Sequence, residues 1–90
     1  MPYVMVNTVY FGNPPVDIEN LITRPIEKEL ESLKGVKTIE STSAQDASMI
    51  FITFNSNIKV EDVLQDVKDA VDRAKNELPN DLTADPSVME

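Results

Sequence analysis

Two segments of this chain repeat apolar residues at helical spacing, and each repeat must be buried against something. In residues 15–34 the apolar positions are Ile18, Leu21, Ile22, Pro25, Ile26, Leu30 and Leu33. In residues 59–78 they are Val60, Val63, Leu64, Val67, Val71, Ala74 and Leu78. A chain of 90 residues supplies one core. We therefore expect residues 1–90 to form a single domain in which both helices cover one shared surface.

That surface is a sheet formed by residues 3–10, 36–43 and 48–54, which are rich in β-branched and aromatic side chains. Successive side chains of a strand point to opposite faces. The set expected beneath the helices is Val4, Val6, Ile39, Ile50, Ile52 and Phe54. The set expected on the open face is Met5, Asn7, Val9, Glu40, Thr42, Met49, Phe51 and Thr53.

The order β-α-β-β-α predicts an α+β fold of the ferredoxin-like split type, with two helices on one face of an antiparallel sheet. The tail, residues 79–90, has two turn-like acidic stretches, and a fourth strand could begin only at Ser87-Val88-Met89-Glu90, so this strand is expected to be truncated. That would leave residues 3–10 as a long, uncharged, unpaired edge, and such edges pair with other strands. We therefore expect self-association through residues 3–10.

Local signals refine the first helix. Pro15 suits its first turn, and Gly12 before it can supply a positive φ. Pro25 lies inside the helix and lacks an N–H, so we expect a bend there. Gly35 is expected to be the left-handed residue that follows the helix end.

Composition excludes several kinds of chemistry. The chain has no Cys and no His, which removes thiolate nucleophiles, ordinary zinc sites and histidine acid–base catalysis. With two glycines it has no phosphate-binding glycine loop. The net charge of −8 disfavours nucleic acid as a partner. We expect no catalytic residue, no metal, no cofactor and no enzymatic activity.

The acidic residues of the second helix alternate with basic ones, and we interpret the spacings Lys68–Asp72 and Asp69–Arg73 as solvated ion pairs. The open face of the sheet is more informative because it is unusually apolar for a soluble domain. Such a face suggests that another surface covers it. The simpler alternative is a set of apolar residues that happen to be exposed.

An ordered set of short motifs runs through residues 4–88. It consists of Tyr10-Phe11-Gly12-Asn13-Pro14-Pro15, Pro25-Ile26-Glu27, Leu30, Leu33, Gly35-Val36, Ser41-Thr42-Ser43, Phe54, Asp66-Val67, Ala70-Val71 and Leu78-Pro79. This set resembles the first porter subdomain of RND (resistance-nodulation-division) efflux transporters, and the AcrB-like multidrug branch in particular. Phe11, Pro14 and Lys59 depart from the family's usual residues, and these departures affect only local turns and caps.

The resemblance implies a proton-driven exporter of small amphiphilic compounds in the bacterial inner membrane, with this segment in the periplasm. It implies as partners the other porter subdomains and protomers of a trimeric pump, a periplasmic adaptor and an outer-membrane channel. Asn7, Met49, Phe51 and Thr53 match positions that face the substrate cleft. Gln65, Asp69 and Asp72 match positions on a pore helix that face the trimer axis.

Three alternatives remain open at this point. The cleft-matching residues could instead pack on a neighbouring subdomain. The chain could be a stand-alone ferredoxin-like module that binds a ligand or regulates another protein. It could also belong to the heavy-metal-exporting branch of the same family, because Met5 and Met49 share a face and methionine is a soft metal ligand.

Overall fold

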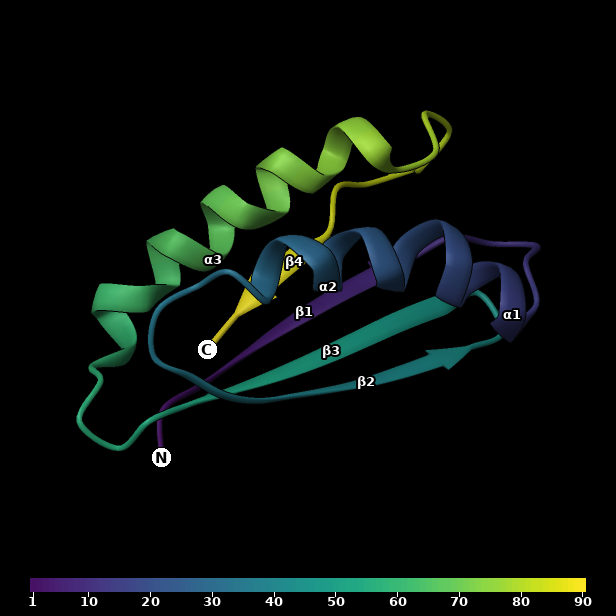
Figure 1. Cartoon of the computed structure of the whole chain (residues 1–90). Coiled ribbons are helices and arrows are strands. Elements are labelled where there is room, and N and C mark those ends of the chain that lie inside the picture. The colour runs from purple at the N-terminus through teal and green to yellow at the C-terminus, as the bar shows by residue number, and fades with distance from the viewer.

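The computed structural model describes residues 1–90 as one antiparallel sheet with its helices on one side (Figure 1). The strands are β1 (Tyr3–Val9), β2 (Val36–Ala44), β3 (Ala47–Phe54) and β4 (Ser87–Met89), in the order β2-β3-β1-β4. The helices are α1 (Pro15–Ile18), the π-helical turn η1 (Glu19–Thr23), α2 (Arg24–Leu30), α3 (Val60–Ala74) and the 3₁₀ turn η2 (Lys75–Glu77). The predicted α+β, ferredoxin-like split fold is confirmed.

The tail returns to the sheet and forms β4, which pairs with β1 in the register Met5↔Met89, Val6↔Val88 and Asn7↔Ser87. Pro86 is buried just before this strand, and Val88 packs against the core. Burial of Pro86 and packing of Val88 stabilise β4, which is too short to show an alternating pattern in the sequence. The expectation that residues 3–10 form an unpaired edge is therefore wrong for Met5–Asn7, and pairing of another strand along the whole of β1 would require β4 to be displaced.

The core lies between the sheet and the helices, and strand alternation selects its members. Val4 and Val6 of β1 are buried with Ile50, Ile52 and Phe54 of β3, as predicted. From the helices it adds Ile22, Ile26, Leu30, Val63, Val67, Ala70, Val71 and Ala74. Ile39 is only half buried, because β2 is an outer strand of the sheet.

The first helix contains a π-helical turn immediately before Pro25. In this turn the N–H of Arg24 donates to the carbonyl of Glu19, five residues earlier. The wider turn reduces the rotation per residue, so that side chains four apart stay on one face. Ile18, Ile22, Ile26 and Leu30 are consequently all fully buried. Leu21, expected on the same stripe, is 42% exposed.

The helix also ends earlier than residue 34. The N–H of Glu31 still bonds to the carbonyl of Glu27, but that of Leu33 bonds to Leu30, only three residues back. Gly35 lies beyond this tightened end, in the turn before β2, so it does not directly follow the helix end. Its φ is nevertheless +80°, and that of Gly12 is +87°.

The two glycines differ in their surroundings. A Cβ on Gly35 would lie 2.9 Å from both Cγ1 and Cδ1 of Ile58, whereas a Cβ on Gly12 would meet nothing within 4 Å. Gly35 is therefore needed both for its positive φ and for its close contact with Ile58, whereas Gly12 is needed only for its positive φ.

We predict that Gly12→Ala costs about 1–2 kcal/mol of stability, the strain of a left-handed alanine. Gly35→Ala should cost about 1 kcal/mol more, because Ile58 has to move as well. Urea unfolding of the two variants and the parent chain checks this. Equal losses of stability in the two variants would show that the contact with Ile58 has no energetic weight.

A small layer of hydroxyl groups lies at the end of the core near α1. Thr23 Oγ1 is 2.8 Å from Ser48 Oγ and 2.9 Å from Ser43 Oγ. Thr23 and Ser48 are both buried, and Thr23 is the only side-chain partner of Ser48. Thr8 is buried in the adjacent strand, but its hydroxyl has no hydrogen-bond partner.

We predict opposite results for one substitution at these two threonines. Thr23→Val leaves the Ser48 hydroxyl buried without a partner and should cost about 1–3 kcal/mol. Thr8→Val replaces an unpaired hydroxyl by a methyl group of the same shape and should be neutral or stabilising. Thermal unfolding of both variants provides the measurement, and a large loss at Thr8 would contradict the hydrogen-bond assignment.

Candidate functional site

The sheet face opposite the helices is uncovered, and the strand register arranges its side chains in rows. One row joins Glu40, Phe51, Met5 and Met89 across the four strands; beside it lie Thr42–Met49–Asn7–Ser87 and Thr38–Thr53–Tyr3. The helices α2 and α3 lie on the other side of the sheet (Figure 1). This open face is therefore available to another molecule.

The structure brings together on this face the four residues that the resemblance assigns to a substrate cleft. Asn7 of β1 lies directly opposite Met49 of β3, and Phe51 and Thr53 follow Met49 at alternate positions of the same strand. Met49 is 40% exposed and Phe51 is 36% exposed. Asn7 and Thr53 are half buried. The four side chains form one continuous surface.

Two further residues of this surface were missed by sequence analysis. The ring of Tyr3 stacks on that of Phe51, with centroids 5.0 Å apart and an interplanar angle of 29°. Met89 pairs with Met5 and is 43% exposed. The alternation of β1 could have indicated Tyr3, because Tyr3 lies two residues before Met5 and therefore points to the same face. A short strand could be expected from Ser87 onward, but three residues of β4 are too few to indicate from sequence which face Met89 occupies.

Asn7 contributes an unusual polar group to the face. Its Oδ1 is buried and accepts no hydrogen bond within the chain. Nearly all buried polar atoms in proteins have a partner, so one without a partner calls for an explanation. A hydrogen-bond donor brought by a ligand or a neighbouring surface would satisfy it.

The residues that the resemblance assigns to a trimer axis, Gln65, Asp69 and Asp72, lie together on the exposed side of α3. Gln65 Nε2 donates to Asp69 Oδ1 at 2.9 Å. Asp72 lies one turn further and pairs with Lys75 Nζ at 2.9 Å, while Lys75 also contacts Asp85 at 3.1 Å. Hydrogen bonds to Asp72 and then to Asp85 raise the pKa of Lys75. This stripe therefore carries charge that is partly neutralised by its own neighbours.

The ion pairs expected within α3 are not formed. Arg73 bonds to Glu29 of α2 at 3.0 Å rather than to Asp69, and Lys68 makes no ion pair with Asp72. A pairing between two helices depends on how the helices pack, which spacing along one helix does not encode. The interpretation of these acids as exposed surface residues nevertheless agrees with their positions.

A polar contact joins the C-terminal end of β1 to the segment that follows α3. The hydroxyl of Tyr10 donates to Asp81 Oδ1 at 2.8 Å, and this hydrogen bond to a carboxylate raises the pKa of Tyr10. The contact ties the segment after α3 to the end of β1. It lies away from the open face and supplies no reactive group.

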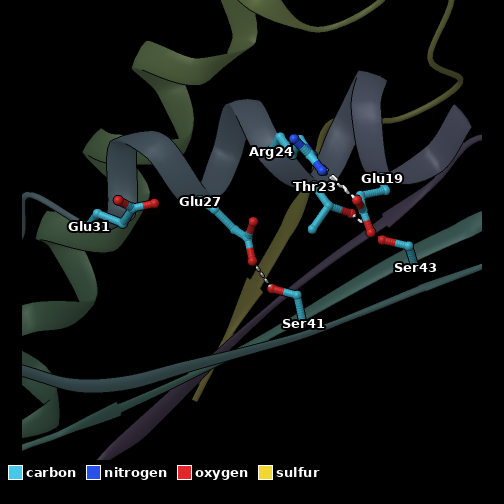
Figure 2. A pocket seen from close by; sticks show the side chains of 7 residues that line it. All are labelled: Glu19, Thr23, Arg24, Glu27, Glu31, Ser41 and Ser43. Carbon is cyan, nitrogen blue, oxygen red and sulfur yellow. Dashed lines mark hydrogen bonds and ion pairs between the residues drawn. The ribbon is translucent and has the colours of Figure 1, made fainter. Parts of the chain in front are cut away.

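The largest hollow of the molecule, about 510 Å³, lies between the first helix and β2. Figure 2 shows its lining, which consists of Glu19, Thr23, Arg24, Glu27, Glu31, Ser41 and Ser43. Arg24 pairs with Glu19 at 2.9 Å, and Glu27 accepts a hydrogen bond from Ser41. No apolar side chain lines the hollow. Because small-molecule pockets are mostly apolar, this hollow does not fit an amphiphilic ligand.

None of the hollows is lined by Asn7, Met49, Phe51 or Thr53. The open face is thus a wall rather than a pocket, and enclosing a ligand on it requires a second surface. No group of three acidic side chains gathers closely enough to hold a metal ion. None of the helices combines the length and the apolar character that crossing a bilayer requires.

Comparison with known protein families gives a match over nearly the whole chain. The model of the AcrB/AcrD/AcrF family matches residues 1–89. This match includes the open face of the sheet and the exposed stripe of α3. The relationship inferred from the ordered motifs is confirmed: the chain belongs to the AcrB/AcrD/AcrF family and is a component of an RND efflux transporter.

Proposed function

We propose that the chain is a periplasmic porter subdomain of a proton-driven RND pump, and that its open face forms one wall of the cleft for small amphiphilic substrates. The observation that carries this proposal is the run of exposed apolar side chains on a sheet face that no helix covers. Tyr3, Met49, Phe51 and Met89 are all exposed there. The subdomain itself performs no covalent chemistry, and the parent transporter lies in the inner membrane.

The side-chain types suit a wall that accepts varied molecules. Methionine is flexible and polarisable, so Met5, Met49 and Met89 can adapt to different shapes. The stacked rings of Tyr3 and Phe51 offer a flat surface to planar compounds. A flat wall of this kind binds weakly by itself, and affinity arises when a neighbouring subdomain closes the cleft.

The stripe of Gln65, Asp69 and Asp72 on α3 is proposed to face the threefold axis of a trimer. Three copies would bring like charges close together there, which costs free energy unless the charges are paired. The bonds from Gln65 to Asp69 and from Lys75 to Asp72 reduce this cost. The remaining partners in this proposal are other porter subdomains, a periplasmic adaptor and an outer-membrane channel.

One observation favours a second candidate, the export of soft metal ions. Met5 and Met89 are directly paired, and Met49 lies diagonally from Met5 on the same face. Thioether sulfurs suit monovalent copper and silver. A transporter of this class would lose silver resistance on Met5→Leu or Met89→Leu, whereas an exporter of organic amphiphiles would keep its silver sensitivity unchanged.

For the principal proposal we predict that Phe51→Ala in the assembled transporter weakens export of aromatic amphiphiles. Loss of an aromatic contact should reduce affinity about two- to tenfold. Phe11→Ala is the matched control, because Phe11 is 71% exposed in the turn after β1, outside the open face. Susceptibility of cells to several chemically different compounds gives the measurement.

Both variants should reach normal expression, since neither residue is in the core. An unchanged susceptibility profile for a normally expressed Phe51→Ala transporter would remove Phe51 from the substrate path. A change of the same size with Phe11→Ala would show that the effect does not depend on the open face.

A further inference from the structure

The charges of this chain are distributed very unevenly over its surfaces. The sequence has 16 acidic and 8 basic residues, yet the strand pairing places only one of them, Glu40, on the open face. The remaining paired residues of that face are Tyr3, Met5, Asn7, Val9, Thr38, Thr42, Ala44, Ala47, Met49, Phe51, Thr53, Ser87 and Met89. Lys37, the unpaired residue of the β2 bulge, is placed on neither face by the pairing, and its Nζ lies 3.6 Å from Met1 Sδ. Glu40 is thus the one charge that the register places among these side chains.

Glu40 is also unpartnered. It is exposed, and it takes part in none of the ion pairs or side-chain hydrogen bonds of the structure. Some exposed acids, such as Glu19, have a basic partner, and others, such as Glu77, have none, so Glu40 is set apart by its position on the open face and not by the lack of a partner alone. The carboxylate of Glu40 is therefore free to interact with a group from outside the chain.

The aromatic side chains next to Glu40 indicate which kind of ligand its carboxylate would bind. Glu40 of β2 lies directly opposite Phe51 of β3. Side chains opposite one another on neighbouring strands have Cβ atoms about 4.5–5.5 Å apart, so one small ligand can touch both. Phe51 in turn stacks on Tyr3. A cation is attracted both by a carboxylate and by the face of an aromatic ring.

Asn7 adds a second hydrogen-bond acceptor to the open face. Its buried Oδ1 lacks a donor, and Asn7 occupies the row of the face next to that of Phe51. The serine and threonine hydroxyls of the face can either donate or accept. Glu40, whose carboxylate only accepts, and Asn7, whose buried Oδ1 lacks a donor, thus both call for a hydrogen-bond donor.

We propose that Glu40 is a specificity-determining residue that makes the open face prefer protonated amines with an aromatic or apolar body over neutral and anionic compounds of the same shape. The amine lies at the carboxylate, and the body lies on Phe51, Tyr3 and the methionines. This inference rests on the proposed function, because it assumes that the face binds amphiphiles. It adds the charge class of the preferred ligand and the residue that selects it.

The net charge of −8 also attracts any cation to the whole molecule, and this general effect has to be separated from a local one. Glu77→Gln removes the same charge as Glu40→Gln. Glu77 is exposed, lies in η2 after α3, and makes no ion pair. The two variants therefore share a net charge and differ only in where the carboxylate is lost.

The test is a titration of the chain with three naphthalene compounds of similar shape: protonated naphthylmethylamine, naphthylmethanol and naphthoate. NMR shifts of backbone amides in β1, β2 and β3 report binding to the open face. We expect the amine to bind most tightly. Glu40→Gln should weaken its binding about two- to fivefold, the size expected for one exposed ion pair. The alcohol should be unaffected by Glu40→Gln, and Glu77→Gln should change the amine's affinity much less.

Two results would overturn the proposal, and they differ in their consequences. If Glu40→Gln and Glu77→Gln weaken the amine equally, or neither does, while all three compounds still bind the face, Glu40 does not select charge and the cleft-wall proposal stands. If none of the three compounds shifts amides of the open face, the charge-selection proposal fails, whereas the cleft-wall proposal, in which affinity depends on a neighbouring subdomain, is decided by Phe51→Ala in the assembled transporter.

Discussion

The antiparallel register between β1 and β3 is the constraint on which the rest of the structure depends. It runs from Tyr3↔Thr53 to Val9↔Ala47 and is extended at both ends by backbone bonds, Phe54 N–H to Pro2 and Tyr10 N–H to Asp46. A slip of one residue would turn Val4 and Val6 outward and Asn7 inward. The same register that buries the core therefore also composes the open face.

The sequence predicts part of the open face, because alternation along a strand is visible in it and the pairing between strands is not. The period of two along each strand is visible in the sequence, and it correctly grouped Asn7, Met49, Phe51 and Thr53 on one side. The pairing across strands is set by turns, and the turn after β2 requires Asp46 at φ +68° with its carboxylate bonded to the N–H of Gly12 at 2.7 Å. Such geometry is not encoded in alternation, so the opposition of Glu40 and Phe51 appears only in the structure.

Three departures of the structure from the sequence patterns have equally specific causes. The spacing of a regular α-helix predicts that Leu21 is buried, whereas the π-helical turn before Pro25 changes the phase of the helix and leaves Leu21 exposed. Arg73 was paired within its own helix because spacing carries no information on the neighbouring α2, where Glu29 lies. β4 depends on the burial of Pro86 and Val88 by residues distant in sequence. In each case long-range packing overrides a local pattern.

The outer strands explain why a partner would meet this sheet through its face rather than its edges. β2 carries a bulge between Val36 and Thr38, where Lys37 is the extra residue, and β4 is only three residues long. Bulges, edge lysines and short edge strands all hinder pairing with another strand. A partner is therefore not expected to add a strand at either edge of the sheet. It would instead contact the side chains of the open face. Side-chain contact through methionines and aromatic rings constrains a ligand's shape less than strand pairing does, which is the property that a cleft for varied substrates requires.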